Sequence, residues 1–124
     1  MWPKTYNGVA FLCRVALTDV TRRFVDDGEK REACFLSPKI AGIHTICVYV
    51  PDGQIAGSEK YAYRLAWLEQ LQRNVEQRCD PAEPLLLCRD LNIAPEDLEV
   101  CDPGVRAAFG RPFDWGLIDA FRLH

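Results

Sequence analysis

The sequence of 124 residues lacks the features that mark several large classes of protein. No apolar run approaches the roughly 20 residues that a transmembrane helix requires, and the N-terminus has no apolar segment typical of a secretory signal. A net charge of −3 and a pI near 5.3 give no global basic field for nucleic acid, although a local basic groove stays compatible with them. We therefore expect one globular, cytoplasmic domain.

The sequence also lacks a recognisable cysteine framework. Its six cysteines form no CxxC pair and match no zinc module in their spacing. Cys13, Cys47 and Cys88 lie inside apolar, strand-like runs, where cysteine behaves as a small hydrophobic residue. We expect buried, reduced thiols, with a metal or disulfide role as the alternative. His44 is expected to be a surface or hydrogen-bonded histidine rather than a metal ligand.

Apolar periodicity predicts several strands and one long helix. Strands are predicted at residues 6–13, 33–36 and 43–50, and an Ala41-Gly42 turn precedes the last of these. A helix is predicted from about Ser58 to Gln77, because Ser58 can cap it and apolar residues recur at three- and four-residue steps. The expected buried stripe is Tyr61, Leu65, Leu68, Leu71 and Val75, and Trp67 and Tyr63 are also interpreted as packing residues.

The most informative segment is the apolar run at residues 85–88, which stops abruptly at Asp90 and Asn92. Such a run predicts a strand buried on both faces. The order strand, long helix, strand predicts a right-handed crossover and an α/β fold. Ligands bind at the carboxyl ends of strands in open α/β sheets, which makes Asp90 and Asn92 a candidate site. Taken alone, the Asp-x-Asn pattern is also typical of an Asx-turn. Beyond it, a short helix is predicted at 103–109 and a last strand at 117–121.

Five motifs occur in an order that resembles a known family. They are KTYNGVA at 4–10, VYVPDGQ at 48–54, GSEKYAY at 57–63, RDLNIAPED at 89–97 and DWGLID at 114–119. Together they resemble the central part of the exonuclease III type of apurinic endonucleases, within the endonuclease/exonuclease/phosphatase superfamily. The resemblance covers nearly all of this chain but only about half of the usual length of the family.

The resemblance implies a fold and an activity. The implied fold is α/β, a partial endonuclease/exonuclease/phosphatase-type sandwich with one mixed sheet and a long crossover helix. The implied activity is that of a DNA-repair hydrolase, an exodeoxyribonuclease or AP endonuclease that cleaves DNA phosphodiesters with Mg²⁺ or Mn²⁺. Tyr49 matches a tyrosine beside the scissile phosphate, although it is equally interpretable as a half-buried strand aromatic. Asp90 and Asn92 match the pair that orients the attacking water and contacts the phosphate.

The resemblance also bears on the metal site and on completeness. Asp90, Asn92 and Glu96 are the candidate oxygen ligands of the metal, although Glu96 and Asp97 are also interpretable as a charge pair at a helix N-terminus. The family's metal-binding glutamate and its histidine segment have no counterpart here, so residues 1–124 are expected to form one truncated domain. Within the best motif, Arg89 replaces a glycine and Leu91 replaces an aromatic residue or methionine.

Two functional interpretations stay open from the sequence. The first is a metal-dependent nuclease in which Glu96, Asp97 and Asp119, or a second subunit, replace the missing ligands. The second is a non-catalytic relic that binds metal or nucleic acid, or that serves as a self-associating module. Half of a two-sheet core would leave one sheet face exposed, so we expect a homodimer or a larger homo-oligomer.

Overall fold

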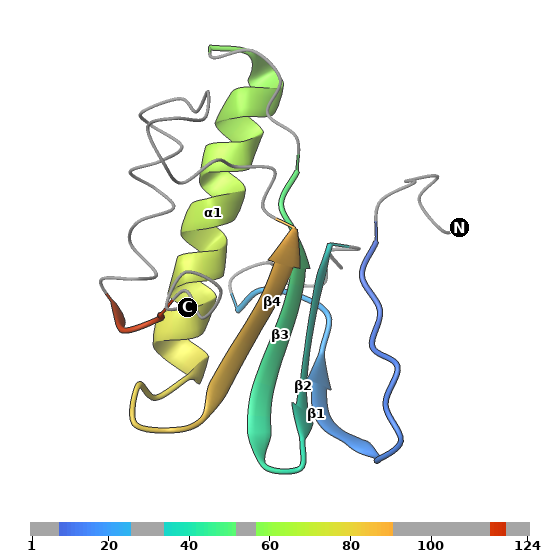
Figure 1. Cartoon of the computed structure of the whole chain (residues 1–124). Helices are drawn as coiled ribbons and strands as arrows, with labels where there is room; N and C mark the ends of the chain where they lie inside the picture. Colours follow the sequence, from blue (N-terminus) through green and yellow to red (C-terminus); the bar gives the residue numbers. More distant parts are fainter. Residues whose placement is uncertain (1–7, 26–33, 52–56, 91–114, 119–124) are drawn as a thin grey trace.

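The computed structural model describes residues 8–25, 34–51, 57–90 and 115–118, which contain one sheet with a helix across one side (Figure 1). The strands lie side by side in the order β1 (Leu17–Thr21), β2 (Phe35–Ile40), β3 (Ile43–Tyr49) and β4 (Leu85–Asp90). β1, β2 and β3 pair antiparallel, whereas β4 pairs parallel to β3 after the helix α1 (Glu59–Arg78). The predicted mixed sheet with a long crossover helix is confirmed.

The β2–β3 hairpin is set by the tight turn between its strands. Ala41 and Gly42 have φ angles of 50° and 80°, and two positive φ angles are what a two-residue turn of type I′ requires. The turn places Ile40 opposite Ile43 and, further along, Leu36 opposite Cys47. The predicted turn and the strand at 43–50 are therefore confirmed, while β2 begins later and runs further than predicted.

Helix α1 begins and ends close to the predicted positions. The side chain of Ser58 accepts a hydrogen bond from the backbone N–H of Tyr61 at 3.2 Å, so Ser58 is the N-cap. At the other end the backbone N–H of Cys79 still donates to the Val75 carbonyl at 2.9 Å. The chain then turns at Asp80, whose carbonyl accepts from the N–H of Glu83 at 2.9 Å, and enters β4.

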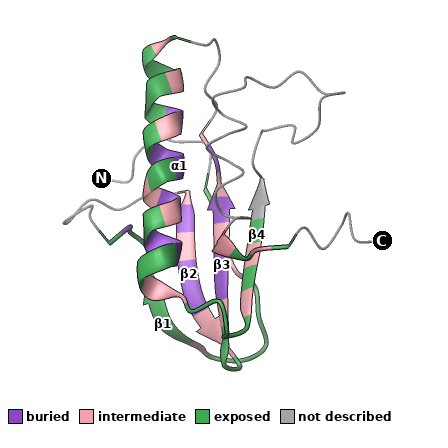
Figure 2. Cartoon of the chain, turned by 90° about the vertical axis from the view of Figure 1, so that its left-hand side faces the viewer, coloured by how far each residue is buried: buried purple, intermediate pink, exposed green. Residues whose placement is uncertain are grey.

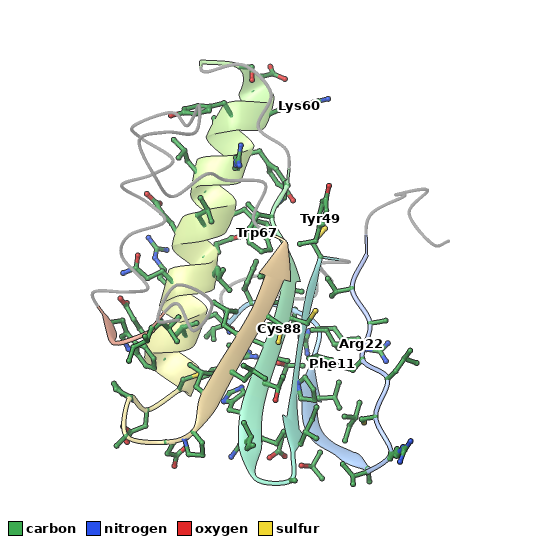
Figure 3. All side chains as sticks on the ribbon, in the orientation of Figure 1. Phe11, Arg22, Tyr49, Lys60, Trp67 and Cys88 are labelled. Atoms are coloured by element: carbon green, nitrogen blue, oxygen red, sulfur yellow. The ribbon has the colours of Figure 1, made fainter. Side chains whose placement is uncertain are left out.

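The core lies between α1 and one side of the sheet, which we call the covered face (Figure 2). Trp67 is 1% exposed, and its ring lies 5.3 Å from that of Phe24, which in turn lies 4.7 Å from Phe35. Figure 3 shows Trp67 pointing from α1 toward the sheet. The predicted stripe on α1 is confirmed, and Trp67 packs as predicted, whereas Tyr63 is 46% exposed and does not pack as predicted. The other buried core residues are Ile46, Val48, Val50, Leu68, Leu71 and Val75.

The opposite side of the sheet, which we call the second face, is less completely covered. The alternation of β3 assigns Ile43, Thr45, Cys47 and Tyr49 to this side, and the parallel register adds Leu86 and Cys88 of β4. Leu86 is 52% exposed and Ile43 is 42% exposed. The prediction that the strand at 85–88 is buried on both faces is therefore wrong, because only Leu85 and Leu87 pack against the core.

Two further predictions fail, namely the strand at residues 8–13 and the burial of two thiols. Residues 8–13 were predicted to lie in a strand, but they have no regular structure and run along the second face (Figures 1 and 2). The first strand is instead β1, which pairs with β2 through an irregular register near Asp19, whose φ is 48°. Cys13 and Cys88 are exposed rather than buried, so the expectation of buried thiols is wrong for both.

The remaining predictions concern short segments and membranes. Residues 117 and 118 are not in a strand, and the rest of the segment predicted at 117–121 lies outside the described residues, as does 103–109. Trp115 is partly buried against the core. No helix within the described residues is both long and apolar enough to cross a membrane.

Candidate active site

The candidate site lies at the edge of the sheet where the parallel strands β3 and β4 both end. The register places Tyr49, the last residue of β3, directly beside Asp90, the last residue of β4. The end of β3 is held on its other side by β2, because the backbone N–H of Tyr49 donates to the Cys34 carbonyl at 3.0 Å. Val50 follows and is fully buried in the core, which fixes the direction of the chain as it leaves the strand. The fold thus brings together two of the three predicted catalytic residues.

Tyr49 is half-buried and belongs to the second face of the sheet. Figure 3 shows its side chain at the end of the sheet, on the side away from α1. A half-buried phenol keeps one apolar edge against the protein while its hydroxyl is available as a hydrogen-bond donor. Both interpretations of Tyr49, a strand aromatic and a residue that contacts a ligand, agree with this placement.

The N-terminal end of α1 lies at the same end of the molecule as this strand edge (Figure 1). Backbone N–H groups of a first helical turn carry a partial positive charge, which favours anions in their neighbourhood. The side chain of Ser58 accepts a hydrogen bond from one of these groups, the N–H of Tyr61, and Glu59 adds a negative charge to the first turn. The helix end therefore contributes a weak positive field at most, and we assign it no binding role.

The other predicted site residues lie beyond what the structure describes. Asp90 is described as a member of β4, whereas Asn92, Glu96, Asp97 and Asp119 lie outside the described residues. Among the residues that the structure does describe, no group of three His, Cys, Asp or Glu side chains could hold a metal ion. The metal ligands named from the sequence, Asp90, Asn92 and Glu96, therefore stay a prediction.

A second polar cluster lies on the covered face at the opposite end of β3. The Nε2 atom of His44 lies 2.8 Å from the Ser37 hydroxyl, and its Nδ1 atom lies 3.4 Å from the Cys79 sulfur. Burial, followed by the positive charge of Lys39, lowers the pKa of His44. The expectation that His44 is a hydrogen-bonded histidine is confirmed.

Sequence reasoning missed the contact between His44 and Cys79. Cys79 follows the last residue of α1, and burial raises the pKa of its thiol. Both groups are therefore favoured in their neutral forms, with the thiol and the imidazole joined by a hydrogen bond. Nothing in the local sequence around either residue signals the other, because the contact is made only when α1 packs on the sheet.

Comparisons with known proteins find DNA nucleases that are similar to this chain in sequence and in fold. No family model matches the chain. Exodeoxyribonuclease III of Haemophilus influenzae is 28% identical over 141 residues, covering 96% of this chain and 53% of its own length. An exodeoxyribonuclease of Bacillus subtilis is 25% identical over 130 residues, covering 96% of this chain and 51% of its own length. An AP endonuclease structure from Archaeoglobus fulgidus matches with a TM-score of 0.80 and 30% identity, over 87% of this chain and 46% of its own. The chain spans about half the length of the curated relatives it matches.

Proposed function

Because this chain is similar in sequence and fold to nucleases of the exonuclease III and apurinic endonuclease type, we propose that it hydrolyses DNA phosphodiesters. The observation that carries the proposal is the pairing of Tyr49 with Asp90 at the carboxyl edge of the sheet. That edge is where α/β proteins bind ligands. A phenol can donate a hydrogen bond to a phosphate oxygen and a carboxylate can orient water, and both assist phosphodiester hydrolysis.

The proposed roles follow from the chemistry of the two side chains. The Tyr49 hydroxyl donates a hydrogen bond to a non-bridging oxygen of the phosphate, which stabilises the charge that develops there. The Asp90 carboxylate accepts a proton from, or orients, the water that attacks phosphorus. Asn92 supplies an amide N–H to another phosphate oxygen. These assignments rest on the strand positions of Tyr49 and Asp90 and, for Asn92, on the motif match.

We further propose that the reaction depends on Mg²⁺ or Mn²⁺. Asp90, Asn92 and Glu96 offer carboxylate and carbonyl oxygens, which are the donor atoms that these hard cations prefer. A bound divalent cation would neutralise charge on the phosphate and favour ionisation of a nearby water.

The test is cleavage of duplex DNA with and without an abasic site, measured in Mg²⁺, in Mn²⁺ and in excess chelator. We expect metal-dependent cleavage by the protein. Asp90→Asn should lower the rate on the order of 10²- to 10⁴-fold, which is the usual contribution of a positioned general base. Tyr49→Phe removes only the hydroxyl and should lower the rate less.

A matched control separates this effect from a general loss of charge. Glu83→Gln removes one carboxylate from an exposed residue of the turn before β4, at the end of the sheet opposite Asp90, and should leave cleavage unchanged. Cleavage that survives Asp90→Asn at the full rate would contradict the proposal. DNA binding without cleavage in any metal would instead support the non-catalytic interpretation.

The partly exposed second face supports a separate proposal, that two copies of the chain associate through it. Leu86 and Ile43 are exposed apolar residues on one side of the sheet, and β4 is one of the two edge strands of the described sheet. Exposed apolar sheet faces and unpaired strand edges are typical sites of association. A second copy offers the same apolar surface in a self-complementary arrangement.

Sedimentation velocity across a range of protein concentrations tests this association. We expect a concentration-dependent dimer that Leu86→Lys dissociates, because a charge placed in an apolar contact must be desolvated. Ala66→Lys, on an exposed position of α1, is the matched control and should leave the dimer intact. A wild-type protein that stays monomeric at every concentration would contradict association through this face.

A further inference from the structure

The parallel register of β3 and β4 places two thiols side by side on the second face. Cys47 of β3 pairs directly with Cys88 of β4, two residues before the pair of Tyr49 and Asp90 on each strand. Cys88 is exposed and Cys47 is half-buried, and neither is in a disulfide. Figure 3 shows Cys88 partway along β4. The two thiols thus lie next to each other and are open to solvent on at least one side.

The backbone geometry is compatible with a covalent link. Neighbouring strands lie about 4.8 Å apart. Disulfides are found where the Cα atoms are about 4.4–6.8 Å apart, although the Cβ atoms must approach to about 4.5 Å or less. To bring the two Cβ atoms within that distance, β4 would have to move toward β3. β4 has a described neighbour on one side only, so it can shift more easily than an inner strand.

From this juxtaposition we propose that Cys47 and Cys88 form an oxidation-sensitive pair that hydrogen peroxide converts into a disulfide across β3 and β4. The Cys88 thiolate, having released its proton to solvent, attacks one peroxide oxygen and breaks the O–O bond. The products are a sulfenic acid on Cys88 and, after protonation of the leaving hydroxide, one water. The Cys47 sulfur then attacks the Cys88 sulfur, and its proton leaves with the hydroxyl group as a second water. One peroxide is thereby reduced to two waters, while two thiols are oxidised to one disulfide.

The environments of the two thiols fit these different roles. Burial, together with the neighbouring Cys88, raises the pKa of Cys47, which keeps that thiol protonated and makes it the poorer first nucleophile. Cys88 is the more accessible of the two, and an accessible thiol with a second cysteine beside it is the usual arrangement of a redox-sensitive pair. The disulfide would fasten the edge strand to β3 next to Tyr49.

Cys34 is the competing partner for Cys47. Its carbonyl accepts the N–H of Tyr49, so Cys34, which directly precedes the neighbouring strand β2, lies across from Tyr49 and diagonal to Cys47. Directly paired residues are closer than diagonal ones, whose Cα atoms lie about 7–8 Å apart in antiparallel strands. That separation exceeds what a disulfide spans, so the register favours Cys88 over Cys34.

The test treats the dilute folded protein with hydrogen peroxide and maps disulfides by mass spectrometry after digestion without reductant. A Cys13→Ser background removes the other thiol that is exposed within the described residues. Trypsin leaves Cys79 and Cys88 on one peptide, because Arg78 and Arg89 flank it, so fragmentation spectra must locate the linked sulfur. We expect an intramolecular link between Cys47 and Cys88 that a reductant removes and that raises the melting temperature by several degrees.

Two single substitutions separate the steps of the reaction. Cys47→Ser should leave a sulfenic acid on Cys88 that a dimedone probe traps, whereas Cys88→Ser should abolish the disulfide. Cys88 is exposed, so its substitution should leave folding intact. A link from Cys47 to Cys34 or Cys79, a product made only between molecules, or dimedone labelling of wild type without any link would overturn the proposal. The test needs no nuclease activity, so its failure is distinct from a failure of the proposed function.

Discussion

The two faces of the sheet are built from alternate residues of the same strands, yet they differ in what covers them. On the covered face, Leu85 and Leu87 of β4 pack against the core beneath α1. On the second face, Leu86 is 52% exposed and Cys88 is also exposed. The same face carries Tyr49 and the paired thiols Cys47 and Cys88, whereas the hydrophobic core lies on the other side of the sheet. Stability and chemistry should therefore respond to different substitutions.

The largest effect is expected in the centre of the covered face. Trp67→Ala removes a side chain that is 1% exposed and contacts Phe24, and it should lower the free energy of unfolding by about 3–5 kcal/mol. Urea denaturation followed by circular dichroism measures this loss. Tyr63→Ala on the same helix is the control, and it should cost much less because Tyr63 is 46% exposed. Equal losses at the two positions would mean that α1 packs through both sides.

A smaller contrast should appear between neighbours on β4. Leu87→Ala opens a partial cavity against the core and should cost about 2 kcal/mol, near the lower end of such substitutions. Leu86→Ala should cost less than about 1 kcal/mol in the monomer, because Leu86 keeps half of its surface in water. Both are measured by urea denaturation at a concentration where sedimentation finds a monomer. A larger loss for Leu86 than for Leu87 would reverse the assignment of the two faces.

The smallest expected effect is the pH dependence that His44, on the covered face, adds to the free energy of unfolding. The folded protein lowers the pKa of His44 below its ordinary value of 6.5, so the unfolded chain binds the proton more readily. This contribution to stability is therefore fully present above about pH 6.5 and is lost as the pH falls through the lowered pKa. Urea denaturation between pH 7.5 and 5, as an approximate range, should show this decline. His44→Gln should flatten it, and an unchanged slope in that variant would assign the decline to other groups.

Much of the fold that positions the site could be predicted from local sequence. β3 follows from its β-branched residues, the hairpin from Ala41-Gly42, and α1 from the Ser58 cap with its apolar stripe. The parallel pairing of β4 follows from a long helix placed between two apolar strands. In each case the decisive interaction is either local in the chain or repeats with a fixed period.

The failed predictions share the opposite property, since each depends on what other parts of the chain do. The apolar residues at 9–13 resemble a strand, but they have no strand in the described structure to pair with. The segment at 17–21 pairs with β2 although it alternates poorly. The burial of Leu86 depends on a covering layer that periodicity cannot supply. For the candidate site, the sequence placed Tyr49 and Asp90 through motif resemblance, whereas their adjacency needed the register.

The crossover that joins β3 to β4 has a further consequence for the order of folding. The β2–β3 hairpin closes over two residues, and hairpins of this kind form within about 1–10 μs. β4 can pair with β3 only after α1 has formed and the chain has folded back, so the entropy of closing that long loop comes first. Tyr49 therefore reaches its final position early, and Asp90 joins it among the last contacts. Any nascent or partly unfolded chain would therefore hold an incomplete candidate site.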